Sequence, residues 1–204
     1  MSKPIQEQFG QVMIDAVNSF ARQDLQTVAA VEAANFPHIG DVALRHRLAE
    51  TLYGARWIYK LGLALLVRDA EQVAHVRAQL IDYASVCEGT LLDMIDHAMQ
   101  IGLLRGSKYR YRDPDKQTQV LAWKVGRHHA LLARQSLYWF ICVSEEEGIV
   151  SSHLAKDLQW LREERNRVHI RSRTHQSFLG ASRDAFDVVL KTINQTRQWK
   201  LGHP

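Results

Sequence analysis

A long stripe of apolar residues at helical spacing most constrains how this chain can fold. From Asp69 to Ile101 apolar side chains recur every three or four residues, with no proline between them. This period marks one face of an α-helix, which neighbouring elements must cover. The stripe consists of Val73, Val76, Leu80, Tyr83, Cys87, Leu91, Met94, Ala98 and Ile101. We therefore expect one long helix here, with the stripe serving as core.

The remainder of the sequence is also helical in pattern. Prolines occur only at positions 4, 37, 114 and 204, and none interrupts a periodic stretch. Asp41 is a plausible N-cap and Gly148 a plausible helix terminator. Further helices are expected over about 6–34, 42–67, 121–147 (in one or two pieces), 152–170 (capped by Ser151 or Ser152) and 175–198. The fold class is therefore all-α, a multi-helix up-and-down bundle in a single domain over 1–204, with helices 1–67 as a candidate extension.

Composition excludes several classes of protein. Hydrophobic residues at 46% and charged residues at 24% are ordinary for a globular chain and argue against disorder. The longest apolar run, 61–67, is about a third of the roughly 20 residues that a membrane span needs. The N-terminus lacks the basic-then-apolar pattern of a signal peptide, so a cytoplasmic location is expected. Cys87 and Cys142 lack ligand spacing and are expected to be reduced, and no cofactor is predicted.

Charge is distributed unevenly along the chain. Residues 1–104 hold 8 basic and 12 acidic side chains, whereas residues 105–204 hold 18 and 10. The second half is therefore the one that faces an anionic partner such as RNA, although a basic balance is also common in proteins without one.

Charged residues fall on the apolar side of a helix in the stretch LQWLREERNRVHI, residues 158–170. At about 100° per residue, Arg165 shares a stripe with Leu154, Leu158, Leu161 and Val168. Arg162 and His169 lie at the edge of this stripe, and Glu163, Glu164 and Arg167 are expected to be exposed. A half-buried arginine needs an anion or an acceptor to compensate for lost hydration. Arg162, Arg165, Asn166 and His169 are therefore expected to share a half-buried face that meets something negative.

The same residues resemble the motif of the HEPN (higher eukaryotes and prokaryotes nucleotide-binding) superfamily, whose members are small α-helical domains and often metal-independent ribonucleases. In that family an Arg, usually followed by Asn, Asp or His, precedes a His by four to six intervening residues. Six residues separate Arg162 from His169, and three separate Arg165, the Arg of the Arg165-Asn166 pair, from His169. The resemblance implies a homodimer with its site between two motif helices, and a role in phage defence or a toxin–antitoxin pair with a regulatory partner.

Two further stretches contribute candidate residues. The segment 85–92 resembles the helix that packs beside the motif helix in this superfamily, so Glu88 either orients Arg162 or Arg165 or is a surface carboxylate. The segment 102–118 is expected to be a loop, and its basic and aromatic residues either contact RNA or form an edge strand or hairpin. These candidate RNA contacts are Lys108, Tyr109, Arg110, Tyr111 and Arg112. Asp93, Asp96 and His97 form a weak metal pattern, and a solvated face is the favoured interpretation.

Two classes of function remain open. In the first, the protein is an endoribonuclease in which His169 is the general acid/base, Arg165 and Arg162 stabilise phosphate charge and Asn166 positions the ribose hydroxyl or a phosphate oxygen. This reading requires no metal. In the second, the protein is a non-catalytic module that binds RNA, a nucleotide or an acidic protein, and the short Arg165–His169 interval supports it.

Overall fold

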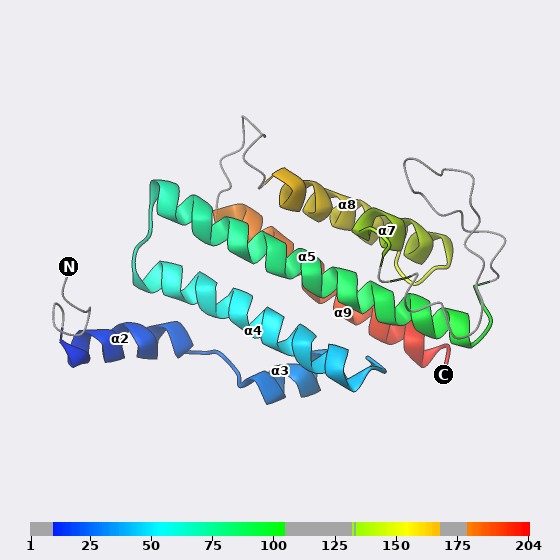
Figure 1. The fold of residues 1–204 in the computed structure, drawn as a ribbon, viewed down its shortest axis with the longest axis horizontal. Coiled ribbons are helices and arrows are strands. Elements are labelled where there is room, and N and C mark those ends of the chain that lie inside the picture. The colour runs from blue at the N-terminus through cyan, green and yellow to red at the C-terminus, as the bar shows by residue number, and fades with distance from the viewer. Residues whose placement is uncertain (1–9, 105–131, 133, 168–178) are drawn as a thin grey trace.

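The computed structural model describes residues 10–104, 132, 134–167 and 179–204. Over these residues the regular structure is entirely α-helical, which confirms the predicted all-α class (Figure 1). The helices are α2 (Gln11–Arg22), α3 (Val28–Asn35), α4 (Val42–Ala64), α5 (Asp69–Gln100), α7 (Leu137–Glu146), α8 (Ser152–Arg167) and α9 (Leu179–Leu201).

Helix α5 is the element against which most other helices pack. It contacts α4, α7, α8 and α9, and Figure 1 shows it running the length of the molecule between α4 on one side and α8 on the other. From Val76 to Ala98, every residue of the predicted stripe is buried, which confirms that this stripe is core. At the ends of the stripe Val73 is partly buried and Ile101 is exposed.

The prediction of one helix over residues 6–34 is wrong over its described part. Helix α2 ends at Arg22, and Asp24 adopts the left-handed conformation with φ of 63°. The side chain of Thr27 then accepts a hydrogen bond from the Ala30 amide and starts α3. An N-cap threonine and a left-handed aspartate are ordinary helix boundaries. The apolar spacing hides this boundary because α2 and α3 both pack on α4.

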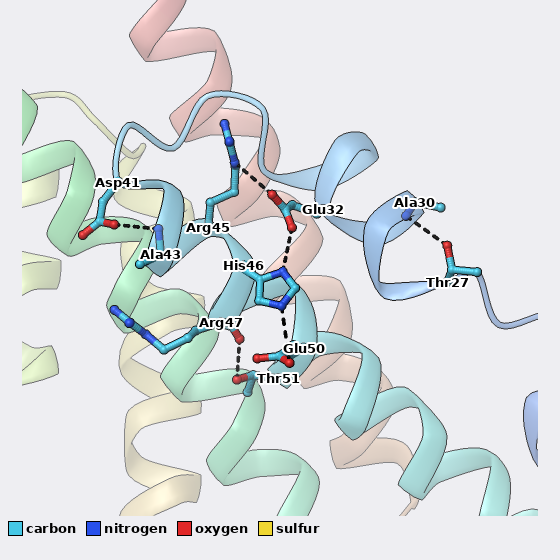
Figure 2. A network of polar contacts seen from close by, with 10 residues as sticks. All are labelled: Thr27, Ala30, Glu32, Asp41, Ala43, Arg45, His46, Arg47, Glu50 and Thr51. Atoms are coloured by element: carbon cyan, nitrogen blue, oxygen red, sulfur yellow. Dashed lines mark hydrogen bonds and ion pairs between the residues drawn. The ribbon is translucent and has the colours of Figure 1, made fainter.

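Helix α3 is joined to α4 by a network of charged groups (Figure 2). Glu32 accepts a hydrogen bond from Arg45 Nε at 3.1 Å, and its other oxygen lies 2.9 Å from His46 Nδ1. The hydrogen bond with His46 is the main cause that lowers the pKa of Glu32, and the same bond raises the pKa of His46. Glu50, with Oε1 3.5 Å from His46 Nε2, adds to the rise.

The predicted capping residues agree with the structure, although α4 ends at Ala64, before the predicted end at residue 67, and α9 continues past the predicted end at residue 198 to Leu201. The Asp41 carboxylate caps α4 by accepting from the amides of Ala43 and Leu44. Gly148 follows α7 with φ of 66°, and the Ser151 hydroxyl accepts from the Leu154 amide at 3.3 Å. Ser151, not Ser152, therefore caps α8.

The predicted solvated face of Asp93 and Asp96 is wrong, because both residues are buried. The Asp93 carboxylate accepts from the amides of Gly40 and Asp41 and lies 3.6 Å from Lys200 Nζ. It thus joins α5 to the connection before α4 and to the end of α9. In the described part of the chain no group of three or more His, Cys, Asp or Glu is arranged to hold a metal.

Both cysteines that the structure describes are free, with Cys87 buried and Cys142 partly buried. Burial raises the pKa of the Cys87 thiol to about 12. Among the described helices, none combines the length and the apolar character needed to cross a bilayer.

Candidate functional site

Helix α8 carries the motif residues on a face that is anchored in the core. Leu154, Leu158 and Leu161 are fully buried, as predicted, and the helix packs against α5, α7 and α9. Val168 lies outside the described residues. Because these leucines fix the rotation of the helix, they also fix where the charged residues between them can reach.

Arg165 is half-buried and reaches across to helix α5. Its Nη1 atom lies 3.3 Å from Glu88 Oε2, and the two side chains are 34% and 27% exposed. Glu88 is therefore neither a free surface carboxylate nor a deeply buried one. The Arg165 side chain is therefore only partly covered by the described residues.

The surroundings of Glu88 disfavour its ionised form, and Arg165 offsets only part of this effect. Burial raises the pKa of this carboxyl group, while the charge of Arg165 and its hydrogen bond lower it by less. Arg165 therefore compensates only part of the lost hydration of Glu88. Within the described part of the chain, Glu88 is also the one hydrogen-bonding partner found for the Arg165 side chain.

Arg162 faces a different neighbour from Arg165. Its Nε donates to Gln159 Oε1 at 2.7 Å, and its Nη2 lies 3.5 Å from Glu163 Oε1. The guanidinium carbon also lies 5.4 Å from the centre of the Tyr138 ring on α7. Arg162 therefore packs towards α7 while Arg165 packs towards α5, so the two arginines flank the apolar stripe instead of converging on one described partner.

The expected exposure of Glu164 is wrong. Glu164 is only 3% exposed, and its Oε1 accepts from Arg167 Nη1 at 2.6 Å. Its direction is only about 60° from that of Leu161 on a helical wheel, so a helix covered by three neighbours buries this position too. Glu163 and Arg167 are exposed, as predicted.

The structure brings some predicted site residues together and leaves others outside the described range. It places Glu88 beside Arg165 and keeps Arg162 half-buried. The expectation that Asn166 shares the half-buried face is wrong, because Asn166 is exposed on the last turn of α8, about 100° around the helix from Arg165. His169 and the predicted RNA-contact segment 108–112 lie outside the described residues.

Two neighbours of Arg162, which are Gln159 and Tyr138, were not predicted from the sequence. Gln159 lies three residues before it, which is a usual spacing for side-chain pairs on a helix and therefore a signal that could have been used. The contact with Tyr138 depends on how α7 packs on α8, and local sequence carries no signal for it.

Comparison of the chain with models of known protein families, with curated proteins and with solved structures gives no match. The class that fold and site define is thus an all-α protein with a half-buried arginine site on α8.

Proposed function

We propose that this chain is a metal-independent endoribonuclease of HEPN type, with Arg162, Arg165, Asn166 and His169 as its catalytic residues. The observation that carries the proposal is the half-buried Arg165, held at 3.3 Å by Glu88 and 34% exposed. A guanidinium fixed on one side and open on the other is suited to a phosphate, because its N–H groups match two phosphate oxygens at once.

The proposed reaction is attack of a ribose 2′-hydroxyl on the adjacent phosphorus. His169 takes the proton of this hydroxyl as the O2′–P bond forms, and a proton is returned to O5′ as the P–O5′ bond breaks. Arg165 and Arg162 stabilise the negative charge that builds up on the phosphoryl oxygens, and Asn166 positions the hydroxyl or a phosphate oxygen. The products are a 2′,3′-cyclic phosphate and a 5′-hydroxyl.

The proposal includes a homodimer in which two motif helices form the site across a basic cleft. Its support is the half-buried cationic face of α8 and the excess of basic residues in the second half of the chain. In a closed two-fold dimer the same face of each subunit meets its copy, so both sites would be built from the same residues.

A second candidate, a non-catalytic module that binds RNA or an acidic partner, is favoured by a specific observation. Each of the three arginines near the end of α8 has a carboxylate within 4 Å, and these pairs are Arg162–Glu163, Arg165–Glu88 and Arg167–Glu164. Such pairs also stabilise a helix and its packing, and so they need no substrate to explain them.

The two candidates are separated by incubating the purified chain with a 5′-labelled RNA, with and without EDTA. The nuclease predicts fragments that end in 2′,3′-cyclic phosphate and appear equally in both samples. The binding module predicts intact RNA together with a shift in mobility that weakens as salt is added. Cleavage that stops with EDTA, or fragments with another chemical end, would contradict the proposed reaction.

A further inference from the structure

A pocket distinct from the α8 site lies between helices α4 and α9, close to the connection between α2 and α3. Both α4 and α9 pack against α5, and residues of α4 and α9 line the pocket, whose volume is about 220 Å³. Its apolar lining comes from Leu25, Val31, Leu52 and Leu190, and polar side chains such as Gln26 and Asn35 line the rest. Since sites for drug-sized ligands usually measure about 300 to 1,000 Å³, this pocket suits a smaller molecule.

The feature that makes this pocket unusual is the cation on its wall. Arg56 of α4 is half-buried, and its guanidinium carbon lies 4.2 Å from the centre of the Phe186 ring and 5.2 Å from that of Tyr59. Among the described residues, no carboxylate lies within ion-pair distance of Arg56. The half-buried arginines Arg45 and Arg165, in contrast, each have a glutamate at 3.1–3.3 Å.

The aromatic neighbours do not replace a counter-ion. Stacking on Phe186 covers one flat face of the guanidinium, but its N–H groups lie at the edge of that plane and still require acceptors. The Tyr83 hydroxyl is close enough for Arg56 to lower its pKa, yet burial raises the pKa of Tyr83 overall, so this hydroxyl is neutral at pH 7. Arg56 thus lines the pocket without a carboxylate partner among the residues that the structure describes.

We propose that this pocket binds a small monocarboxylic acid, with the carboxylate paired to Arg56 and the hydrocarbon body packed on the apolar walls. A monoanion fits better than a phosphate dianion because, among the described residues, Arg56 is the one cationic side chain that lines the pocket. Asp24 also lines the pocket, and Lys60 Nζ, 3.3 Å from its carboxylate, offsets its negative charge. This binding site is independent of RNA cleavage.

The first test compares acids with their amides on the unmodified full chain. Two acids, phenylpropanoate and hexanoate, are titrated alongside phenylpropanamide and hexanamide. Binding is followed by the NMR chemical shifts of the protein's backbone N–H groups. The acids should bind with Kd below about 1 mM and shift resonances of residues around Arg56. The amides should bind about 10- to 150-fold more weakly, because a hydrogen bond to a charged group is lost. Equal binding of acid and amide, or no binding of either acid, would overturn the proposal.

The second test removes the charge of Arg56. Arg56→Gln should weaken binding of phenylpropanoate at least about tenfold, whereas Arg47→Gln, an exposed arginine on the same helix, should leave it unchanged. Thermal unfolding of each variant establishes that it folds. A folded Arg56→Gln variant that binds the acid as well as the unmodified chain would also overturn the proposal. If this variant does not fold, the comparison of acid and amide decides alone.

Discussion

The Oε2 atom of Glu88 on α5 lies 3.3 Å from the Nη1 atom of Arg165 on α8, and this contact joins two helices that are far apart in sequence. This polar contact lies beside the buried leucines that anchor α8 in the core. The pair is therefore placed to stabilise the packing of α8 and also to orient the Arg165 guanidinium. The two roles are separable by experiment.

The structural role predicts a measurable coupling between the two side chains. In a double-mutant cycle of Glu88→Gln, Arg165→Gln and the double variant, urea unfolding should give a coupling of about 0.5–1 kcal/mol. This value lies in the range of exposed pairs because both side chains are about one-third exposed. A coupling of zero would mean that the contact contributes nothing to stability.

If Arg165 orients a phosphate, replacing it should reduce activity while the protein still folds. Arg165→Ala should lower the rate of RNA cleavage about 10²- to 10³-fold, and Arg165→Lys should restore little because an ammonium group cannot make the two-pronged contact. Arg183→Ala, at an exposed arginine of α9, is the matched control and should keep full activity. Full activity in Arg165→Lys would exclude a bidentate role for this residue.

The core of α8 is predicted to depend strongly on Leu158. Because this side chain is fully buried, Leu158→Ala should reduce the free energy of unfolding by about 2–5 kcal/mol. The control is Leu201→Ala at the end of α9, where the side chain is 72% exposed and the change should be below about 0.5 kcal/mol. Denaturant unfolding measures both, and a small effect at Leu158 would contradict the described packing of α8.

The network between α3 and α4 is predicted to depend on pH. The raised pKa of His46 means that its contribution to stability is fully present below pH 6.5 and is lost as pH rises through the folded value. The lowered pKa of Glu32 means that its contribution is present above pH 4.5 and is lost as pH falls through its folded value. The attachment of α3 should therefore be strongest between pH 4.5 and 6.5.

Hydrogen exchange of the α3 amides and an NMR titration of the His46 ring test this dependence. Protection of α3 should fall as pH rises above the His46 transition, after correction for intrinsic exchange rates. His46→Gln should remove that transition, whereas His153→Gln, at an exposed histidine of α8, should leave it in place. Protection that rises through the His46 transition would have the wrong sign for this account.

Local signals were sufficient for several parts of the fold. The apolar period of α5 predicted a helix from Asp69, and the structure shows it starting there. Asp41 caps the start of α4 with its side chain, and Gly148 follows α7 in the left-handed conformation that glycine adopts easily. These features are predictable because they depend on residues within one or two turns of the chain.

Features that depend on distant partners were not predictable. Asp93 and Asp96 carry charges that usually face solvent, yet both are buried, and Asp93 is surrounded by amides before α4 and by Lys200 of α9. Likewise, the burial of Glu164 depends on how many helices surround α8. For the candidate site, the sequence offered Glu88 as partner of either Arg162 or Arg165, and only the packing of α8 on α5 selects Arg165.

The most direct test of the proposed function is the single-turnover rate of RNA cleavage by His169→Ala. The account predicts a loss of about 10²- to 10⁴-fold, which is the usual share of general acid–base catalysis, with thermal unfolding nearly unchanged. His153→Ala, at a histidine of α8 that is 82% exposed, should cleave at the unmodified rate. Cleavage by His169→Ala at the unmodified rate, or an unmodified chain that binds RNA and leaves it intact, would contradict the catalytic assignment.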